Sequence, residues 1–348
     1  MPSDNPPDRA LSLEKLRRAP KVELHVHLEG SIRPETLLEL ARRNSVDLPA
    51  DDVEGLRRWF VYSGFERFIE VYITITRSLR TVEDYELIVR DFGAEMARQN
   101  VRHAEATFSP GTHRLFGVAS DVFLEGLRRG RAAVEREHGV SLRWIFDIVR
   151  NSDDIRAEGD FVTSLAIEMK GEGVVALGLG GMEAGRPPEP FAPWFERAKS
   201  AGLASTPHAG ETAGPESVWG AIRALGADRI GHGVRAIEDP ALVEHLAERR
   251  IPLEICPTSN LRLGVCRSYE EHPMKRLIEA GCVVTIDSDD PPLFNTTLEG
   301  EIALMTGPLG LNRFQAREVI LNGARCAFLP AESRARLASE LGQAGRPR

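Results

Sequence analysis

The stretch KVELHVHL at residues 21–28 is a short run of mostly Val and Leu between a proline and Glu29-Gly30. Such a bounded apolar run is typical of a strand buried in a parallel sheet. Side chains alternate along a strand, so His25 and His27 project from the same face near its end. Seven more runs of this kind follow: VRHAEATFS (101–109), LRWIFDIV (142–149), GVVALGLG (173–180), GLASTPHAG (202–210), RIGHG (229–233), IPLEICP (251–257) and CVVTIDSDD (282–290).

Helical patterns separate most of these runs. Examples are PETLLELARRN (34–44), DYELIVRDFGAEMARQN (84–100) and PALVEHLAERR (240–250). Eight strands that alternate with helices favour a (β/α)8 TIM barrel, an α/β fold, over an open doubly wound sheet. A chain of 348 residues is long enough for one such barrel.

The expected domain organisation is a single barrel over residues 20–335, between a disordered lead (1–19) and a C-terminal tail (336–348). From about residue 32 to 100 the pattern is helical without a convincing strand, which indicates an insertion after the first strand that covers the active site as a lid. Its aromatic side chains either pack a small core of the insertion or line a pocket. They are Trp59, Phe60, Tyr62, Phe65, Phe68 and Tyr72.

Charge and composition narrow the classes of partner. The chain is 42% hydrophobic and 28% charged, with a net charge of −8. An acidic surface repels phosphate backbones and anionic lipids, so we expect no nucleic acid and no membrane partner. No apolar run approaches the ~18 residues needed to cross a bilayer, and the first residues lack a secretory pattern. Four scattered cysteines without a CxxC pair favour the cytoplasm. The sequence does not predict an oligomeric partner.

Polar groups gather where these strands end, which is where a barrel keeps its active site. His25 and His27 end the first run, His208 ends the fifth and His232 the sixth. Asp289 and Asp290 end the eighth. These residues are far apart in the chain and converge only in a closed barrel. Taken singly, His-x-His suits a packed strand end as well as a ligand pair, and Asp-Asp-Pro suits a helix cap.

Three histidines and a carboxylate are the ligands of a divalent ion that binds nitrogen and oxygen, and Zn²⁺ is the usual candidate. Zinc lowers the pKa of bound water to about 7. Glu211, three residues after His208, can carry protons, while His232 and Asp290 can orient or polarise the water. The other histidines are expected to be structural or on the surface: His103, His113, His138, His245 and His272.

The sequence resembles the adenosine deaminase family of the metal-dependent amidohydrolases. The similar stretches are PKVELHVHLEGS (20–31), VRHAEATFSP (101–110), STPHAGE (205–211), RIGHG (229–233), EICPTSN (254–260) and TIDSDDP (285–291). The resemblance implies one zinc ion held by His25, His27, His208 and Asp289. It also implies that Glu211 exchanges protons with the purine N1 and the nucleophile. His232 and Asp290 would position the water, and the backbone of Gly181 would donate to the purine N3.

The reaction implied by the resemblance is hydrolytic deamination of a 6-aminopurine nucleoside, with release of ammonia and the 6-oxo product. An ester, lactone or phosphoester hydrolase on the same barrel and a silent binding protein with a deaminase fold are the alternatives. The zinc deaminases with H-x-E and P-C-x-x-C motifs are not matched, because no second cysteine follows Cys256 at that spacing.

Two departures from the family pattern concern the substrate. Glu29 stands where adenosine enzymes of the family usually carry Asp, at a position that generally contacts the 5′ end of the ribose. The segment GLGGMEAGRPPEPF (178–191) has Gly178 and Met182 where aspartates often occur, and it retains Glu183. The predicted substrate contacts are Glu29, Gly181, Glu183 and Asp290. A 5′-modified nucleoside such as aminodeoxyfutalosine, a menaquinone-pathway intermediate, is therefore a candidate beside adenosine. Adenine remains the alternative, as does a Glu29 exchange without any change of substrate.

Overall fold

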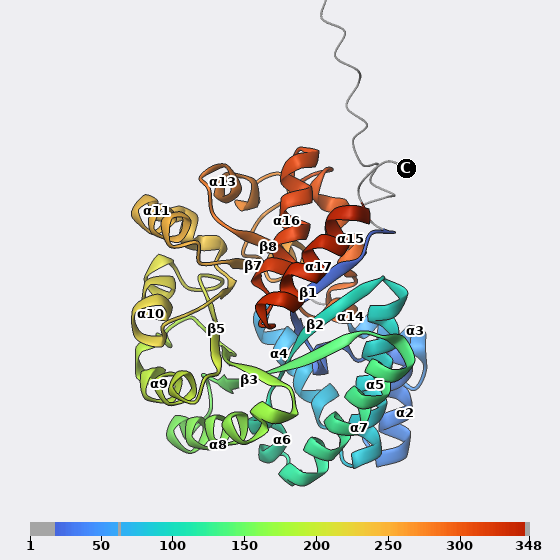
Figure 1. Ribbon diagram of the computed structural model, residues 1–348. Coiled ribbons are helices and arrows are strands. Elements are labelled where there is room, and N and C mark those ends of the chain that lie inside the picture. The colour runs from blue at the N-terminus through green and yellow to red at the C-terminus, as the bar shows by residue number, and fades with distance from the viewer. Residues whose placement is uncertain (1–17, 62–63, 345–348) are drawn as a thin grey trace, which may run out of the picture.

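The computed structural model describes residues 18–61 and 64–344, and its centre is a ring of eight parallel strands surrounded by helices (Figure 1). The strands pair in chain order from first to last. They are β1 (Lys21–His27), β2 (Val101–Phe108), β3 (Ser141–Val149), β4 (Val174–Gly180), β5 (Ala204–Ala209), β6 (Ile230–His232), β7 (Leu253–Ile255) and β8 (Val284–Ile286). All eight predicted strands are confirmed.

The ring closes between its first and last strands. The His27 N–H donates to the Asp289 carbonyl at 2.9 Å, and the Asp289 N–H donates to the His25 carbonyl at 3.0 Å. A parallel bridge between Val26 and Asp289 lies at the same place. The predicted (β/α)8 barrel is therefore confirmed, and its closure brings residues of β1 against the loop after β8.

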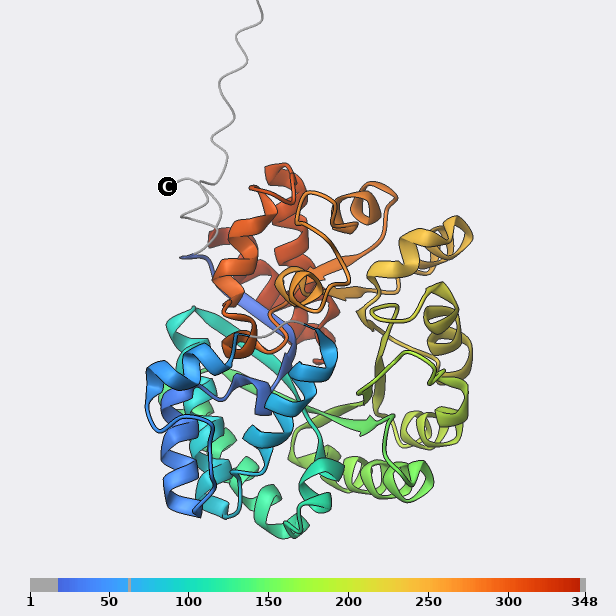
Figure 2. The same cartoon turned by 180° about the vertical axis from the view of Figure 1, so that it is seen from behind.

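Helices form the outer layer on all sides of the ring (Figures 1 and 2). Their bounds are α2 (Pro34–Asn44), α3 (Val53–Trp59), α4 (Phe65–Thr76), α5 (Val82–Arg98), α6 (Pro110–Leu115), α7 (Ser120–His138), α8 (Ile155–Glu168), α9 (Ala192–Ser200), α10 (Pro215–Leu225), α11 (Pro240–Arg249), α12 (Pro257–Arg262), α13 (Met274–Glu279), α14 (Pro291–Phe294), α15 (Leu298–Met305), α16 (Arg313–Cys326) and α17 (Ala331–Ala344). Short 3₁₀ turns such as Glu29–Ser31 connect some of them.

Local sequence signals explain several helix ends. Proline at the first position of α2 presets a helical φ and needs no N–H partner there. Thr81 and Asp84 form a reciprocal capping box at the start of α5. Gly226 takes a left-handed conformation that ends α10. These helix starts and ends set where each chain segment turns back toward the ring.

The segment from residue 32 to 100 is helical, as predicted, but its helices differ in position. α5 packs against β2 and α7, with Gly126 and Gly130 of α7 giving room to Tyr85 and Val89, so α5 is an ordinary outer helix of the barrel. α4 instead lines the central cavity through Phe68 and Tyr72. Of the described part of this segment, α4 is what lines the cavity, so the lid stays a prediction and is restricted to α4. Tyr62 and the Phe65 side chain lie outside the described residues.

The predicted C-terminal tail from residue 336 is wrong over most of its length. α17 continues to residue 344 and buries Leu337 and Leu341 against α16. The Gly- and Pro-containing end of the chain obscured the apolar spacing of this helix. The predicted lead falls almost entirely on residues 1–17, outside the described residues.

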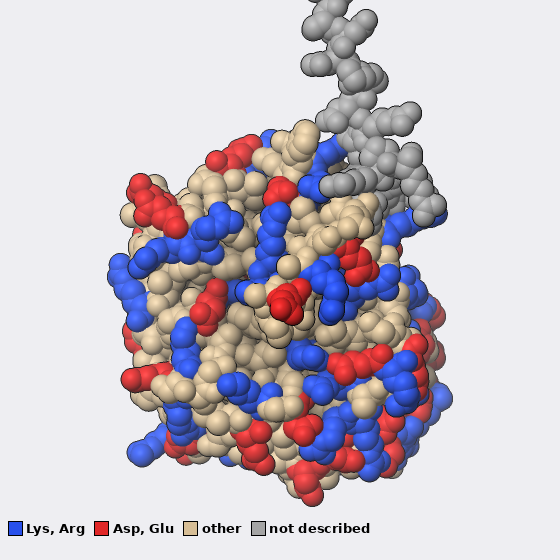
Figure 3. All heavy atoms as spheres, in the orientation of Figure 1, with Lys and Arg blue, Asp and Glu red and all other residues tan. Residues whose placement is uncertain are grey.

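Two further expectations concern membranes and thiols. In the described ranges no helix is long and apolar enough to cross a membrane. All four cysteines are free: Cys256, Cys266, Cys282 and Cys326. On the face shown in Figure 3, Lys and Arg alternate with Asp and Glu without one broad patch of either sign.

Candidate active site

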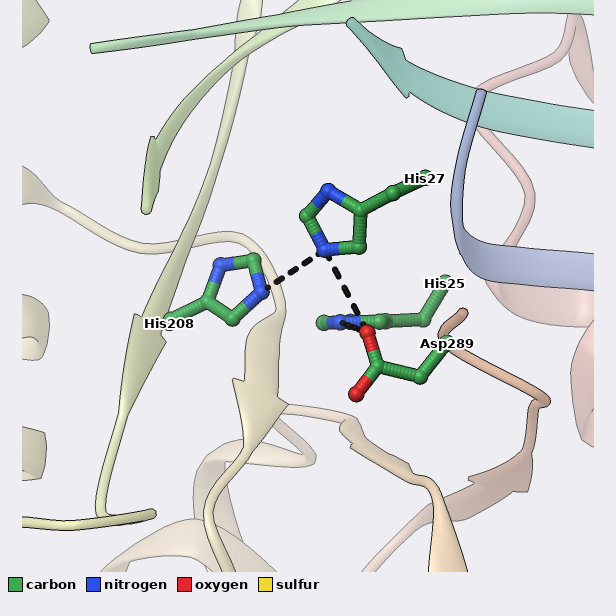
Figure 4. A group of neighbouring side chains, drawn as sticks. All are labelled: His25, His27, His208 and Asp289. Atoms are coloured by element: carbon green, nitrogen blue, oxygen red, sulfur yellow. Dashed lines mark hydrogen bonds and ion pairs between the residues drawn. The ribbon is translucent and has the colours of Figure 1, made fainter. Parts of the chain in front are cut away.

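Four side chains from three parts of the barrel point toward one spot at the carboxyl ends of the strands (Figure 4). His25 and His27 come from β1, His208 from β5, and Asp289 follows β8. The Nε2 atoms of His27 and His208 are 3.3 Å apart, and the His27 Nε2 is 3.3 Å from an Asp289 oxygen. The His25 Nε2 is 3.7 Å from the same oxygen. The structure thus brings together all four predicted metal ligands.

This group fits a tetrahedral divalent ion. Ligand atoms held about 2.0–2.1 Å from one zinc ion at tetrahedral angles lie about 3.3 Å from each other, close to the observed separations. The His25 Nε2 is buried without a hydrogen-bond partner. Leaving such a nitrogen unpaired is costly unless something else binds it. The donor set therefore suits an ion with nitrogen and oxygen ligands.

A buried chain of polar groups holds His25 from behind. Its Nδ1 is 2.9 Å from the Glu254 carboxylate on β7. Glu254 in turn pairs with Arg229, which also contacts Glu105 of β2 at 2.7 Å. Arg229, together with a hydrogen bond from His25, lowers the Glu254 pKa to about 2 against the effect of burial. An ionised carboxylate on Nδ1 leaves Nε2 free to bind a metal.

Glu211 lies in the loop after β5 and is buried beside the ligand cluster. Its carboxylate is 3.6 Å from the His232 Nε2. Burial and the nearby carboxylates of Asp289 and Glu183 raise its pKa well above the usual value. A raised pKa favours the protonated form of the carboxyl, which is the form that general acid catalysis uses.

Glu183, a predicted substrate contact, lies behind this loop rather than in the cavity wall. Its carboxylate accepts four backbone hydrogen bonds at 2.6–3.0 Å, from the N–H groups of residues 210, 211, 212 and 213. A carboxylate with this many donors is well stabilised although it is buried. Its contact role toward substrate stays a prediction, and in the structure it fixes the backbone that carries Glu211.

His232 is held by two further side chains. Its Nδ1 contacts the Asn260 amide at 3.2 Å, and the Asn260 oxygen contacts the His272 Nε2 at 3.1 Å. Burial and the neighbouring His25 lower the His232 pKa to about 3. His272, expected to be structural, thus acts on the site only through Asn260. His113 likewise lies outside the cavity wall and contacts the Glu29 carboxylate at 3.0 Å.

Two residues of the site have a strained backbone. His232 and Asp289 adopt positive φ values of 60° and 63°, which non-glycine residues rarely do. Such strain is concentrated at functional sites and persists only where surrounding contacts impose it. Asp290 follows directly, lines the cavity and has a buried oxygen without a partner. A side chain at Gly30 would collide with it, with its Cβ 1.6 Å from the carboxylate.

A cavity lies over the ligand cluster, and apolar side chains and a few polar groups line it. Such a lining is typical of small-molecule sites. α4 forms one wall with Phe68, Ile69, Tyr72 and Ile73. Residues after β2, within and after β3, and after β4 also line the cavity, and they are Ser109, Asp147, Val149, Asn151 and Gly181. Gly181 lines the cavity, and its predicted contact with the purine stays a prediction, whereas Glu29 is fully buried beneath the wall.

Sequence reasoning from strand ends missed Asp147, Glu254 and Asn260. Asp147 and Glu254 stand inside apolar strand runs, where a charged residue is unusual and was itself a signal. Asn260 belongs to the EICPTSN stretch after β7, a strand end to which no role was given. All three contact or line the site that the strand-end residues form.

Comparisons with known proteins agree with this geometry. Residues 20–344 match the family model described as adenosine deaminase. The chain is 43% identical over 322 residues to the aminodeoxyfutalosine deaminase of Streptomyces coelicolor, covering 92% of this chain and 83% of that protein. It is 39% identical over 334 residues to the adenine deaminase of Cupriavidus necator, with 96% and 94% covered.

Solved structures are similar over nearly the whole chain. The adenine deaminase of Arthrobacter aurescens has a TM-score of 0.87 at 29% identity, with 93% of this chain and 98% of that chain covered. An amidohydrolase of Burkholderia ambifaria with bound Zn has a TM-score of 0.86 at 27% identity, with 95% and 93% covered. The chain belongs to the adenosine deaminase family and is a metal-dependent amidohydrolase that acts on C–N bonds.

Proposed function

We propose that the protein catalyses zinc-dependent hydrolytic deamination of a 6-aminopurine nucleoside, releasing ammonia and the 6-oxo product. The observation that carries this proposal is the buried Glu211 carboxyl with a raised pKa, next to four convergent residues that could hold a metal ion, in a cavity with a largely apolar lining. An acid beside a metal site suits addition of water to a heteroaromatic ring, because the ring nitrogen must gain a proton as the carbon is attacked.

The residues of the candidate active site have separate tasks in this reaction. His25, His27, His208 and Asp289 would hold one zinc ion, which when bound supplies Lewis-acid activation of water at neutral pH. Glu211 gives a proton to the ring nitrogen N1 and later carries one to the leaving amine. His232 and Asp290 orient the attacking water from the side of β6 and β8. The backbone of Gly181 and the wall of α4 position the base.

For the substrate, we propose adenosine or a 5′-modified adenosine ahead of free adenine. The relative named aminodeoxyfutalosine deaminase supports a nucleoside, and so does the cavity wall that continues from the ligand cluster to β2, β3 and β4. We propose that Glu29, which lies beneath this wall, contributes to recognition of the 5′ end of the ribose. The cytoplasm is the proposed location, and small purines are the proposed partners.

Free adenine is the second candidate substrate, favoured by the relatives named adenine deaminase. The test is a measurement of kcat/KM for adenosine, adenine and aminodeoxyfutalosine with zinc-loaded protein, following ammonia release. A higher value for either nucleoside supports the proposal. A clear preference for adenine contradicts the ranking, and no ammonia from any of the three contradicts the proposed reaction.

A further inference from the structure

A carboxyl group that the proposed reaction does not use lies in the cavity wall. Asp147 belongs to β3, far from the ligand cluster in sequence, and lines the same cavity as His27 and Glu211. Its side chain is 2% exposed. Burying an acid costs free energy unless something stabilises it, so its place in the wall needs a reason.

The contacts of Asp147 within the protein leave one oxygen available. The Ser109 hydroxyl donates a hydrogen bond to Oδ1 at 2.7 Å. Among the described residues, none other than Ser109 donates a hydrogen bond to this carboxyl, so Oδ2 receives none from a neighbouring residue. The charged groups that affect this carboxyl most are the Glu29 and Glu158 carboxylates, which oppose its ionisation instead of neutralising it. A buried carboxyl with one unmatched oxygen beside a cavity is suited to a ligand.

Neighbouring glycines make the room in which this carboxyl lies. Gly178 pairs with Asp147 in the register between β3 and β4. A Cβ at Gly180 would lie 2.3 Å from Oδ2, and one at Gly178 would lie 3.0 Å from the Asp147 Cβ. Any side chain at Gly180 would therefore displace the carboxyl. The sequence of β4 thus keeps the Oδ2 side of Asp147 open.

The chemistry of this part of the wall fits a hydroxyl group. A carboxyl that keeps its proton can both donate and accept, and so can a sugar hydroxyl. Burial raises the pKa of Asp147 to about 8, which leaves it mainly protonated at neutral pH. The lining of the same cavity also includes Val149, Ile73 and Thr112, which are apolar or weakly polar. The purine itself is accounted for by Glu211, Asp290 and Gly181 in the proposed function.

We propose that Asp147, held by Ser109, is a specificity-determining residue that hydrogen-bonds a hydroxyl of the sugar carried by the purine, so that the site prefers a nucleoside to the free base. This inference rests on the proposed function for the class of substrate. It adds a residue and a contact that discriminate between nucleoside and base.

The test measures binding of two unreactive products, inosine and hypoxanthine, to full-length zinc-loaded protein by calorimetry. They differ only in the sugar. In Asp147→Val the affinity for inosine is expected to fall about 10- to 100-fold, because a polar contact is lost, while the affinity for hypoxanthine changes less than about threefold. Asp147→Asn, which keeps a donor and an acceptor, restores most of the inosine affinity.

Controls separate recognition from stability. Thr163→Val removes a buried hydroxyl of α8 outside the cavity and leaves both affinities unchanged. If the valine variant does not fold, Asp147→Ala, which adds no bulk, takes its place. An equal loss for inosine and hypoxanthine, or an unchanged inosine affinity, overturns the inference.

A kinetic arm distinguishes this inference from the proposed function. The ratio of kcat/KM for adenosine to that for adenine is expected to fall about 10- to 100-fold in Asp147→Val. Wild-type protein that releases no ammonia, yet loses inosine binding with Asp147→Val, contradicts the proposed function and keeps this inference. If the wild-type protein is active and Asp147→Val leaves the substrate ratio unchanged, the proposed function stands and this inference is contradicted.

Discussion

At the residue scale, Glu211 has the most specific environment in the cavity. Glu183 fixes its backbone, and burial beside Asp289 favours its protonated form. In the proposed reaction this group transfers a proton, which an amide of the same shape cannot do.

Glu211→Gln is therefore expected to lower kcat for deamination by about 10² to 10⁴-fold, while substrate affinity changes little. The measurement is ammonia release under saturating substrate, with zinc content determined on the same sample. A matched exposed change, Glu137→Gln on α7, leaves kcat unchanged. Retained activity in Glu211→Gln would remove Glu211 from the mechanism.

Glu254 gives a second prediction, because it contacts the Nδ1 of His25, whereas the proposed metal ligand is the Nε2 of the same ring. Loss of its charge in Glu254→Gln weakens the hold on the His25 Nδ1. Zinc affinity, measured by competition with a chelator, is expected to fall about 10- to 100-fold. If the zinc affinity of Glu254→Gln is unchanged, the Glu254 contact does not affect metal binding by His25, even where the variant is less stable.

Asp147 predicts a pH dependence of stability. In the folded protein the Asp147 carboxyl keeps its proton up to about pH 8. In the unfolded chain it loses the proton near pH 4, the ordinary pKa of an aspartate. The folded state binds more protons in this window, so this group makes the free energy of unfolding fall as pH rises from 4 to 8. Asp147→Asn removes the effect.

The free energy of unfolding of Asp147→Asn, relative to wild type, is thus expected to be more favourable at pH 8 than at pH 5. Urea denaturation at both values measures it. The exposed Asp153→Asn is the control. If the free energy of unfolding of Asp147→Asn differs from that of wild type by the same amount at both pH values, Asp147 is ionised in the folded protein throughout this range.

How far these residues could be predicted depends on where they stand in a strand. The proposed ligands and Glu211 lie at or just after strand ends, and parallel strands in a barrel end at one face, so their convergence could be predicted. Asp147 and Glu254 stand within strands, and their partners Ser109 and Arg229 lie directly after β2 and directly before β6. Such contacts depend on register and closure, which strand patterns in one sequence do not determine.

At the scale of elements, α4 decides how the cavity is covered. Phe68 stacks on Phe294 of α14, with ring centroids 5.4 Å apart. This contact joins the lid to the segment that follows the Asp289 and Asp290 pair. Periodicity predicted helices throughout residues 32–100, but it carries no information on which helix faces the cavity and which packs on the outside of the barrel.

Phe68→Ala is expected to raise KM for nucleosides by about tenfold with a smaller change in kcat, because the apolar wall is lost but the catalytic groups stay in place. Steady-state kinetics with adenosine measures it. Phe314→Ala, an exposed aromatic on α16, is the matched control. A large fall in kcat with unchanged KM would mean that α4 positions the catalytic groups instead of covering the substrate.

At the scale of the whole molecule, closure of the barrel makes the site. Ligands on β1, β5 and after β8 are separated by up to 264 residues of chain, and the bonds between Asp289 and β1 bring the ends together. An ion bound by groups from both halves of the chain binds the folded state alone, so it adds to the stability of the entire barrel.

Zinc is therefore expected to raise the Tm, and a chelator to lower it, by several degrees. In His208→Ala the shift on adding zinc should be small or absent. Scanning calorimetry with and without zinc measures both. A Tm that zinc raises equally in His208→Ala would place the ion elsewhere.

The most direct test of the central claim, that this face of the barrel is a zinc-dependent deaminase site for 6-aminopurine nucleosides, is ammonia release from adenosine and aminodeoxyfutalosine by metal-free and zinc-restored protein. The account predicts release only after one equivalent of zinc is restored, and its loss in Glu211→Gln. Equal release without the metal, or none from either nucleoside after zinc is restored, would contradict it.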